Sequence, residues 1–148
     1  RMEKLIVYTD GGARGNPGPA AIGVVIQDAN GNTLKTYGET IGEKTNNEAE
    51  YQAVIFTLKK IKQLFGKEKA QAMRIEFRMD SELAVEQLSN RYKIQGENLQ
   101  KLFMEVRNLL IDIKGGVTCA HVPREQNRAA DRLVNEALDK EQQKLFDA

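Results

Sequence analysis

Four carboxylate side chains stand at positions where folding could bring them together. Asp10 ends the apolar run KLIVYTD, and Asp80 ends RIEFRMD, in which apolar and charged residues alternate. Glu50 and Asp131 lie in two helical stretches. Because sites in open α/β sheets gather beyond the carboxyl ends of the strands, we expect both aspartates at one edge if their strands are parallel neighbours. Four such groups would repel one another without a cation, and oxygen ligands of this kind suit Mg²⁺ or Mn²⁺.

Helical periodicity predicts the direction of the Glu50 side chain. In a helix of about 3.6 residues per turn, Glu50 shares a row with Val54 and Ile61, whereas Glu48 shares one with Lys59. Glu50 is therefore expected to lean toward the sheet. A carboxylate on the inner edge of an apolar stripe is costly unless it is paired or binds a metal.

Each carboxylate also has an ordinary structural explanation. Asp10 could begin a turn, and Asp80 before Ser81 could cap a helix. Glu50 could answer the helix dipole, and Asp131 could be a solvated helix residue paired with a nearby arginine. Taken singly, these alternatives stay open.

The elements that must position these residues follow from hydrophobic period and turn signals. Strands are predicted at residues 4–10, 20–28, 33–41, 74–80 and 117–122, and helices at 45–65, 81–89, 96–113 and 124–146. Asn30-Gly31 suits a hairpin turn, so the first three strands should form an antiparallel meander. The order β-β-β-α-β-α-α-β-α predicts one α/β domain over residues 1–148, with a mixed sheet flanked by helices.

Composition limits the class of protein. The 148 residues include 22 basic and 21 acidic side chains, so contacts with a nucleic acid would have to be local. No stretch approaches the roughly 20 apolar residues of a membrane span, and no signal-peptide pattern opens the chain. Cys119 is the single cysteine and lies in an apolar segment, which favours an inert core thiol and a reducing, cytoplasmic setting. We expect a monomer with no membrane association and no protein partner.

Four segments, in order, resemble the type 1 ribonuclease H family. They are YTDGGARGNPGPAAIGVVI, TNNEAEYQA, MDSELAVEQL and HVPREQNRAADRLVNEA, and the resemblance runs from about Lys4 to Leu138. It implies the three-layer ribonuclease H-like fold, with a five-stranded mixed sheet of three antiparallel strands followed by two parallel ones. The implied form is the compact bacterial or archaeal one that lacks a basic protrusion.

The resemblance also implies an activity and a site. The RNA strand of an RNA–DNA hybrid would be cut internally, leaving 5′-phosphate and 3′-hydroxyl ends. Asp10, Glu50, Asp80 and Asp131 would hold two Mg²⁺ ions, for which Mn²⁺ could substitute, with Asp10 bridging them. The residues implied to contact the substrate are Gly11, Gly12, Arg14, Asn16, Thr45, Asn46 and Asn47. A 2′-hydroxyl, which donates and accepts, distinguishes RNA from DNA. Capping of the helix at residues 45–65 is the structural alternative for the TNN run.

Three features depart from the family pattern. Many relatives carry a histidine in a loop before the last helix, but His121 reads as the end of the last strand, so Arg124, or else Glu125, is predicted to occupy that region. Arg124 is the catalytic candidate because a cation near the leaving phosphate is favourable. Residues 91–93 supply at most a small basic patch in place of the protrusion. Glu82 replaces a glutamine-like RNA contact.

Three rival hypotheses remain from the sequence. A catalytically inactive hybrid-binding module would need a missing carboxylate, and none is missing. A resolvase or exonuclease on the same fold would lack the glycine-rich segment together with TNN. A domain of a larger polymerase or fusion protein is the third. The sequence does not decide whether double-stranded RNA or a single ribonucleotide in DNA is accepted.

Overall fold

The computed structural model describes residues 3–90 and 93–147. Its strands are β1 (Lys4–Ala13), β2 (Gly18–Asp28), β3 (Thr33–Lys44), β4 (Arg74–Met79) and β5 (Val117–His121). Its helices are α1 (Asn46–Phe65), α2 (Lys67–Ala72), α3 (Glu82–Leu88), α4 (Glu97–Leu110), the 3₁₀ turn η1 (Arg124–Gln126) and α5 (Arg128–Asp147).

The five strands form one mixed sheet in the order β3-β2-β1-β4-β5. β1 and β3 both pair antiparallel with β2, while β4 runs parallel to both β1 and β5. This arrangement confirms the predicted sheet of three antiparallel strands followed by two parallel ones.

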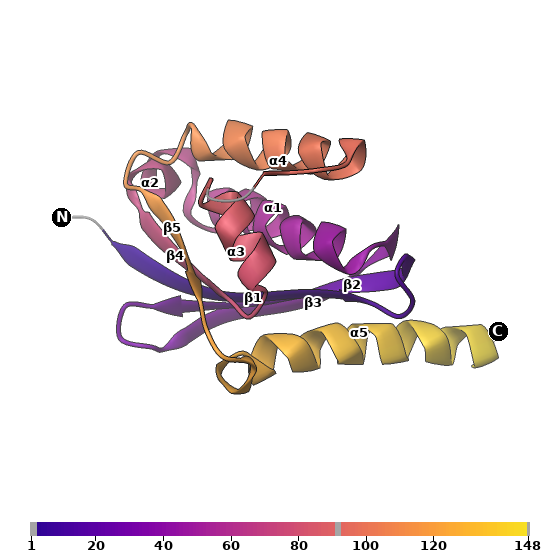
Figure 1. Ribbon diagram of the computed structural model, residues 1–148. Coiled ribbons are helices and arrows are strands. Elements are labelled where there is room, and N and C mark those ends of the chain that lie inside the picture. Colours follow the sequence, from indigo (N-terminus) through magenta and orange to yellow (C-terminus); the bar gives the residue numbers. More distant parts are fainter. Residues whose placement is uncertain (1–2, 91–92, 148) are drawn as a thin grey trace.

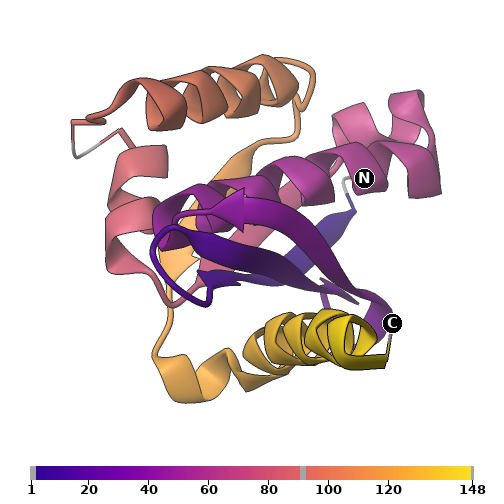
Figure 2. The ribbon, with the colours of Figure 1, turned by 90° about the vertical axis from the view of Figure 1, so that its right-hand side faces the viewer.

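The helices cover the two faces of the sheet unequally, which makes three layers. Helices α1, α3 and α4 lie on one face and α5 lies on the other (Figure 1). Figure 2 shows the strands between α1 and α5. The main core joins α1 to the sheet around Tyr51, Ile61 and Phe77, and a small cluster of Ala21, Val134 and Leu138 joins α5 to β2. No helix in the described part of the chain has the length and apolar character that crossing a membrane requires.

The largest differences from the sequence predictions concern β1, α2 and the final helix. β1 does not end at Asp10 but continues to Ala13, because Gly11 and Gly12 pair with Ile22 and Ala21 of β2. Short helix α2 was not predicted, and the final helix is divided into η1 and α5. The glycine-rich segment thus begins inside the sheet rather than as a loop.

Two glycines let helices approach the sheet backbone from opposite faces. A Cβ on Gly11 would overlap the backbone of Ala49 in α1, and a Cβ on Gly23 would overlap the carbonyl group of Ala130 in α5. Gly23 pairs with Asp10 across the β1–β2 ladder. These contacts seat both helices close to the end of β1 that carries Asp10.

We predict that Gly23→Ala lowers the free energy of unfolding by about 1–3 kcal/mol, because the added methyl group must displace α5. Gly12→Ala is the matched control, since its Cβ would lie 3.6 Å from Val134 Cγ1, an ordinary contact. Urea unfolding followed by circular dichroism measures both. Equal stability of the two variants would show that the approach of α5 to Gly23 is not tight.

Candidate active site

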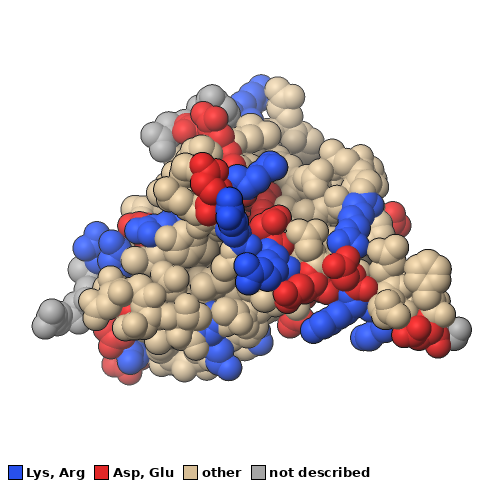
Figure 3. All heavy atoms as spheres, turned by 90° about the horizontal axis from the view of Figure 1, so that it is seen from below, with Lys and Arg blue, Asp and Glu red and all other residues tan. Residues whose placement is uncertain are grey.

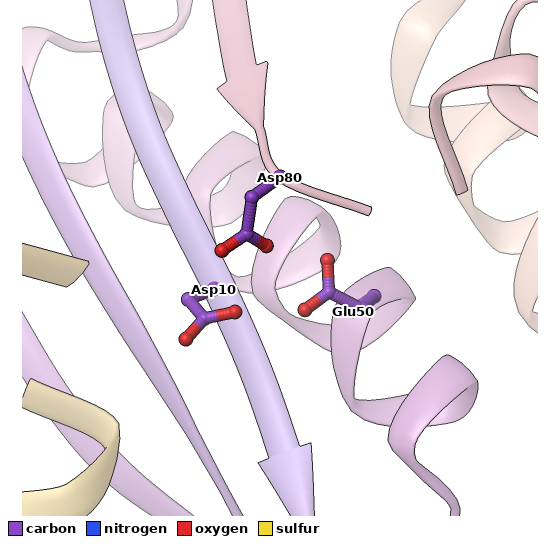
Figure 4. A group of neighbouring side chains, drawn as sticks. All are labelled: Asp10, Glu50 and Asp80. Atoms are coloured by element: carbon purple, nitrogen blue, oxygen red, sulfur yellow. The ribbon is translucent and has the colours of Figure 1, made fainter. Parts of the chain in front are cut away.

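Three of the four predicted carboxylates converge at one edge of the sheet (Figure 4). One oxygen from each of Asp10, Glu50 and Asp80 lies within 4.8 Å of the others. The last paired residues of the parallel strands β1 and β4 are Tyr8 and Arg78, so Asp10 and Asp80 both lie two residues further along. Glu50 reaches them from the first turns of α1.

Glu50 is held by the backbone of Gly11, a position where a Cβ would overlap the backbone of Ala49. Its Oε1 accepts a hydrogen bond of 2.7 Å from the Gly11 N–H, and the side chain is 5% exposed. Its Oε2 is buried and has no hydrogen-bond partner among the described residues. An unpartnered buried carboxylate oxygen is costly, so the chemistry of this atom fits a bound cation or proton.

The pKa values of all three carboxyls are raised. Burial raises the pKa of Asp10 to about 7, and the charges of Asp80 and Asp131 add to this. Burial, followed by the charge of Asp10, raises the pKa of Glu50 well above its ordinary value. Burial also raises the pKa of Asp80. These three carboxyls are difficult to ionise together, and their oxygen atoms are the ligands that a divalent cation such as Mg²⁺ prefers.

Arg124 and Asn127 moderate the pKa of Asp80. The Arg124 charge is the largest influence that lowers it, and a hydrogen bond from Asn127 lowers it further. Asn127 is buried at the end of η1, where its Nδ2 donates a hydrogen bond of 2.9 Å to the Thr9 carbonyl oxygen. Asn127 thus ties the start of α5 to β1. Its role was missed in the sequence, where only its place beside Asp131 was visible.

Asp131 does not belong to the group of three carboxylates, but its side chain forms a hydrogen bond with Asp10 and its charge raises the pKa of both Asp10 and Asp80. It is exposed in the first turn of α5, and its Oδ1 lies 3.4 Å from the Asn135 Nδ2. It nevertheless lines the same hollow, of about 610 Å³, as Asp10, Glu50 and Asp80. Arg124 lines this hollow as well.

Six of the seven predicted substrate contacts also line this hollow: Gly11, Gly12, Arg14, Asn16, Asn46 and Asn47. The seventh, Thr45, caps α1 reciprocally with Glu48, which is the structural alternative stated for the TNN run.

Several of these polar groups bind one another. The Asn16 Oδ1 accepts a hydrogen bond of 2.9 Å from the Asn46 N–H, and the Asn46 Oδ1 accepts one of 2.8 Å from the Ala13 N–H. The Arg14 guanidinium donates a hydrogen bond of 2.6 Å to the Asp139 carboxylate in α5. The wall of the hollow is therefore built by hydrogen bonds between segments far apart in the sequence.

Gln87 is a buried amide that sequence reasoning did not identify. Its Oε1 accepts a hydrogen bond of 2.9 Å from the Tyr51 hydroxyl and one of 3.3 Å from the Asn47 Nδ2. Because the Asn47 Nδ2 donates to Gln87, the Asn47 Oδ1 is available to accept a hydrogen bond from a ligand. The available signal was a polar residue on the buried face of α3, beside Ala84.

The remaining candidates lie away from the carboxylates. His121 ends β5, is exposed and does not line the hollow, as expected for a strand-end residue. Glu82 is the first residue of α3 and is exposed. In the basic patch predicted at residues 91–93, Lys93 is exposed, and Arg91 and Tyr92 lie outside the described residues.

Comparison with known proteins gives concordant matches. Residues 8–137 match the family model described as reverse transcriptase-like. The chain is 41% identical over 139 residues to ribonuclease HI of Halobacterium salinarum, which covers 94% of this chain and 66% of the relative. It is 39% identical over 137 residues to the bifunctional protein Rv2228c of Mycobacterium tuberculosis, covering 92% of this chain and 36% of that protein.

A solved structure extends the comparison. The crystal structure of LC11-RNase H1 in complex with an RNA/DNA hybrid superposes with a TM-score of 0.86 at 47% identity, covering 92% of this chain and 97% of the other. The chain thus matches nearly all of one solved domain but spans about two thirds or less of the two curated relatives named above.

We predict that Asp10→Asn changes how stability depends on pH in metal-free buffer. The Asp10 pKa is raised from 3.8 to about 7 on folding, so its contribution to stability is present below about pH 4 and is lost as pH rises through 7. Each pH unit between the two values corresponds to at most about 1.4 kcal/mol. The variant should be more stable than the wild type at pH 8, and the difference should shrink toward pH 4.

Urea unfolding in EDTA at pH 4, 6 and 8 measures this dependence. Glu68→Gln, an exposed change of the same charge in α2, is the control and should follow the wild type. A difference in stability between Asp10→Asn and the wild type that does not grow from pH 4 to 8 would contradict the raised pKa of Asp10.

Proposed function

The chain belongs to the type 1 ribonuclease H family, and we propose that it cuts the RNA strand of RNA–DNA hybrids internally. The observation that carries the proposal is the convergence of Asp10, Glu50 and Asp80 with one buried oxygen unpartnered. The products would carry 5′-phosphate and 3′-hydroxyl ends. Similarity to ribonuclease HI over 94% of this chain favours this activity over that of a resolvase or exonuclease.

The metal site would be formed by the same carboxylates. Asp10, Glu50 and Asp80 would hold two Mg²⁺ ions together with Asp131 from the rim, and Mn²⁺ could replace them. When bound, such ions activate a water for attack and stabilise the leaving oxygen. Asp10 is the proposed shared ligand, since its pKa is raised by the charges of both Asp80 and Asp131.

The protein's own groups would orient the RNA strand. The Gly11 N–H keeps one Glu50 oxygen in place, so the other stays directed away from the backbone. Arg124 lines the hollow close enough to lower the pKa of Asp80, which suits a cation that faces a phosphate.

Recognition of RNA would use the amides and backbone on the wall of the hollow. Glycine backbone at Gly11 and Gly12 and the side chains of Asn16, Asn46 and Asn47 line the site. The Asn47 Oδ1 could accept from a 2′-hydroxyl, which DNA lacks. Arg14 and Thr45 are proposed substrate contacts as well, although both are engaged within the protein, Arg14 with Asp139 and Thr45 with Glu48.

We also propose a reducing, cytoplasmic setting for the protein. Burial raises the pKa of the Cys119 thiol to about 11, so this lone cysteine is a poor nucleophile and fits a reducing cytoplasm. We expect a monomer. The mycobacterial relative, of which the chain spans 36%, shows that this domain also occurs within longer proteins.

We predict internal cuts in the RNA strand of an end-labelled hybrid with Mg²⁺, and no cuts in free RNA, RNA duplex or DNA duplex. Asp10→Asn should lower the rate by at least about 10³-fold because it removes the shared ligand. Glu68→Gln is the charge-matched control and should retain the wild-type rate. Denaturing gels with markers that carry 3′-hydroxyl ends identify the products.

Other outcomes separate the rival functions. Tight binding of the hybrid without cleavage in either Mg²⁺ or Mn²⁺ would leave a binding module. Cleavage of DNA would indicate a different nuclease on this fold.

We predict that Gln87→Leu raises the KM for the hybrid about tenfold with a smaller change in kcat, because Asn47 loses the partner that orients it. Tyr51→Phe, which removes only the other hydrogen bond to Gln87, is the control. If Gln87 acts through Asn47, its effect on KM should largely vanish in an Asn47→Ala background. Additive effects on KM would contradict that coupling.

A further inference from the structure

A second hollow opens beside the carboxylates and has no role in the function proposed above. It measures about 570 Å³ and is lined by Arg124, Glu125, Arg128, Asp131, Arg132 and Asn135. Three of these residues, Arg124, Asp131 and Asn135, also line the hollow that contains Asp10 and Glu50. The two hollows are therefore neighbours, with Arg124, Asp131 and Asn135 at the boundary between them.

Arg124, Arg128 and Arg132 form an arginine ridge along η1 and the start of α5. Arg128 and Arg132 are four residues apart in α5, so they share one face at a rise of about 6 Å. All three are exposed. In Figure 3 the face covered by α5 shows Lys and Arg interspersed with Asp and Glu.

None of the three ridge arginines forms an ion pair with another residue in ranges 3–90 and 93–147. Arg14, by contrast, is paired with Asp139 further along α5. The charge of Arg124 acts on Asp80 across the first hollow. The guanidinium groups of Arg128 and Arg132 are thus left to bind a ligand.

The position of these arginines disfavours a purely structural role. Arg128 is the first residue of α5 and Arg132 lies in its second turn. Cations near a helix N-terminus oppose the helix dipole, so neither residue stabilises the helix electrostatically. Guanidinium groups match phosphate oxygens in geometry and are weakly hydrated, which makes a phosphate the ligand they fit best.

We propose that the arginine ridge binds the phosphates of the RNA strand next to the one that is cut. This rests on the proposed function, because the strand that passes the carboxylates would continue into the adjoining hollow. The ligand class is a polyanionic backbone, and the ridge would contribute affinity without reading bases.

The test measures how binding depends on salt. A fluorescein-labelled hybrid is titrated in EDTA with Asp10→Asn protein, which also excludes cleavage, from 50 to 200 mM KCl. Adding Arg128→Gln and Arg132→Gln should weaken binding at 50 mM at least tenfold and reduce the slope of log K against log salt by about 1.5–2. Lys67→Gln with Arg74→Gln removes the same charge from exposed positions in α2 and β4 and should leave the slope unchanged.

A second arm identifies the strand. Neutral methylphosphonate linkages beside the cleavage position are placed either in the RNA strand or in the DNA strand. The difference between ridge variant and parent should disappear with the neutral RNA strand and persist with the neutral DNA strand.

The opposite strand pattern would overturn the assignment to RNA. A ridge variant with the slope of the charge-matched control would overturn the site itself. Cleavage by the otherwise wild-type chain is assayed in parallel, so an unchanged slope beside normal cleavage refutes only the ridge, whereas absent cleavage refutes the proposed function.

Discussion

The molecule depends on one electrostatic constraint, the confinement of three carboxylates in a partly buried space. Their mutual repulsion and their desolvation both oppose ionisation, as the raised pKa values of Asp10, Glu50 and Asp80 show. Folding of the hydrophobic core must outweigh this cost. Tyr51, which follows Glu50, and Phe77, three residues before Asp80, are both fully buried in this core. Cation binding would relieve the same repulsion, which couples ligation to stability.

Close contact between helices and strands converts that constraint into a defined geometry. Gly11 permits α1 to approach β1, and its N–H then holds the Glu50 carboxylate. Gly23, opposite Asp10 in the ladder, permits α5 to approach from the other face. The Asn127 side chain connects the start of α5 to the Thr9 carbonyl group beside Asp10. The lack of a side chain at Gly11 and at Gly23 thus allows α1 and α5 to bring their acidic residues close to Asp10 in β1.

Charge is separated on a short scale although the whole chain carries a net charge of only +1. The first hollow contains the carboxylates of Asp10, Glu50 and Asp80, and the adjoining one contains Arg128 and Arg132, while Arg124 lines both. Asp131 belongs to both. An anionic strand that is held by arginines on one side and by metal-bearing carboxylates on the other would need no broad basic surface.

Features that depend on periodicity and strand direction could be predicted from the sequence. Helical spacing predicted that Glu50 points inward, and the paired strand endings predicted that Asp10 and Asp80 share an edge. The sequence did not determine that β1 continues to Ala13, because cross-strand pairing with β2, not the local turn propensity of Asp-Gly-Gly, decides where that strand ends. The roles of Gln87 and Asn127 depend on hydrogen bonds between residues 36 and 118 positions apart. Only tertiary structure selects such partners, since a buried amide bonds to whatever polar group packing brings beside it.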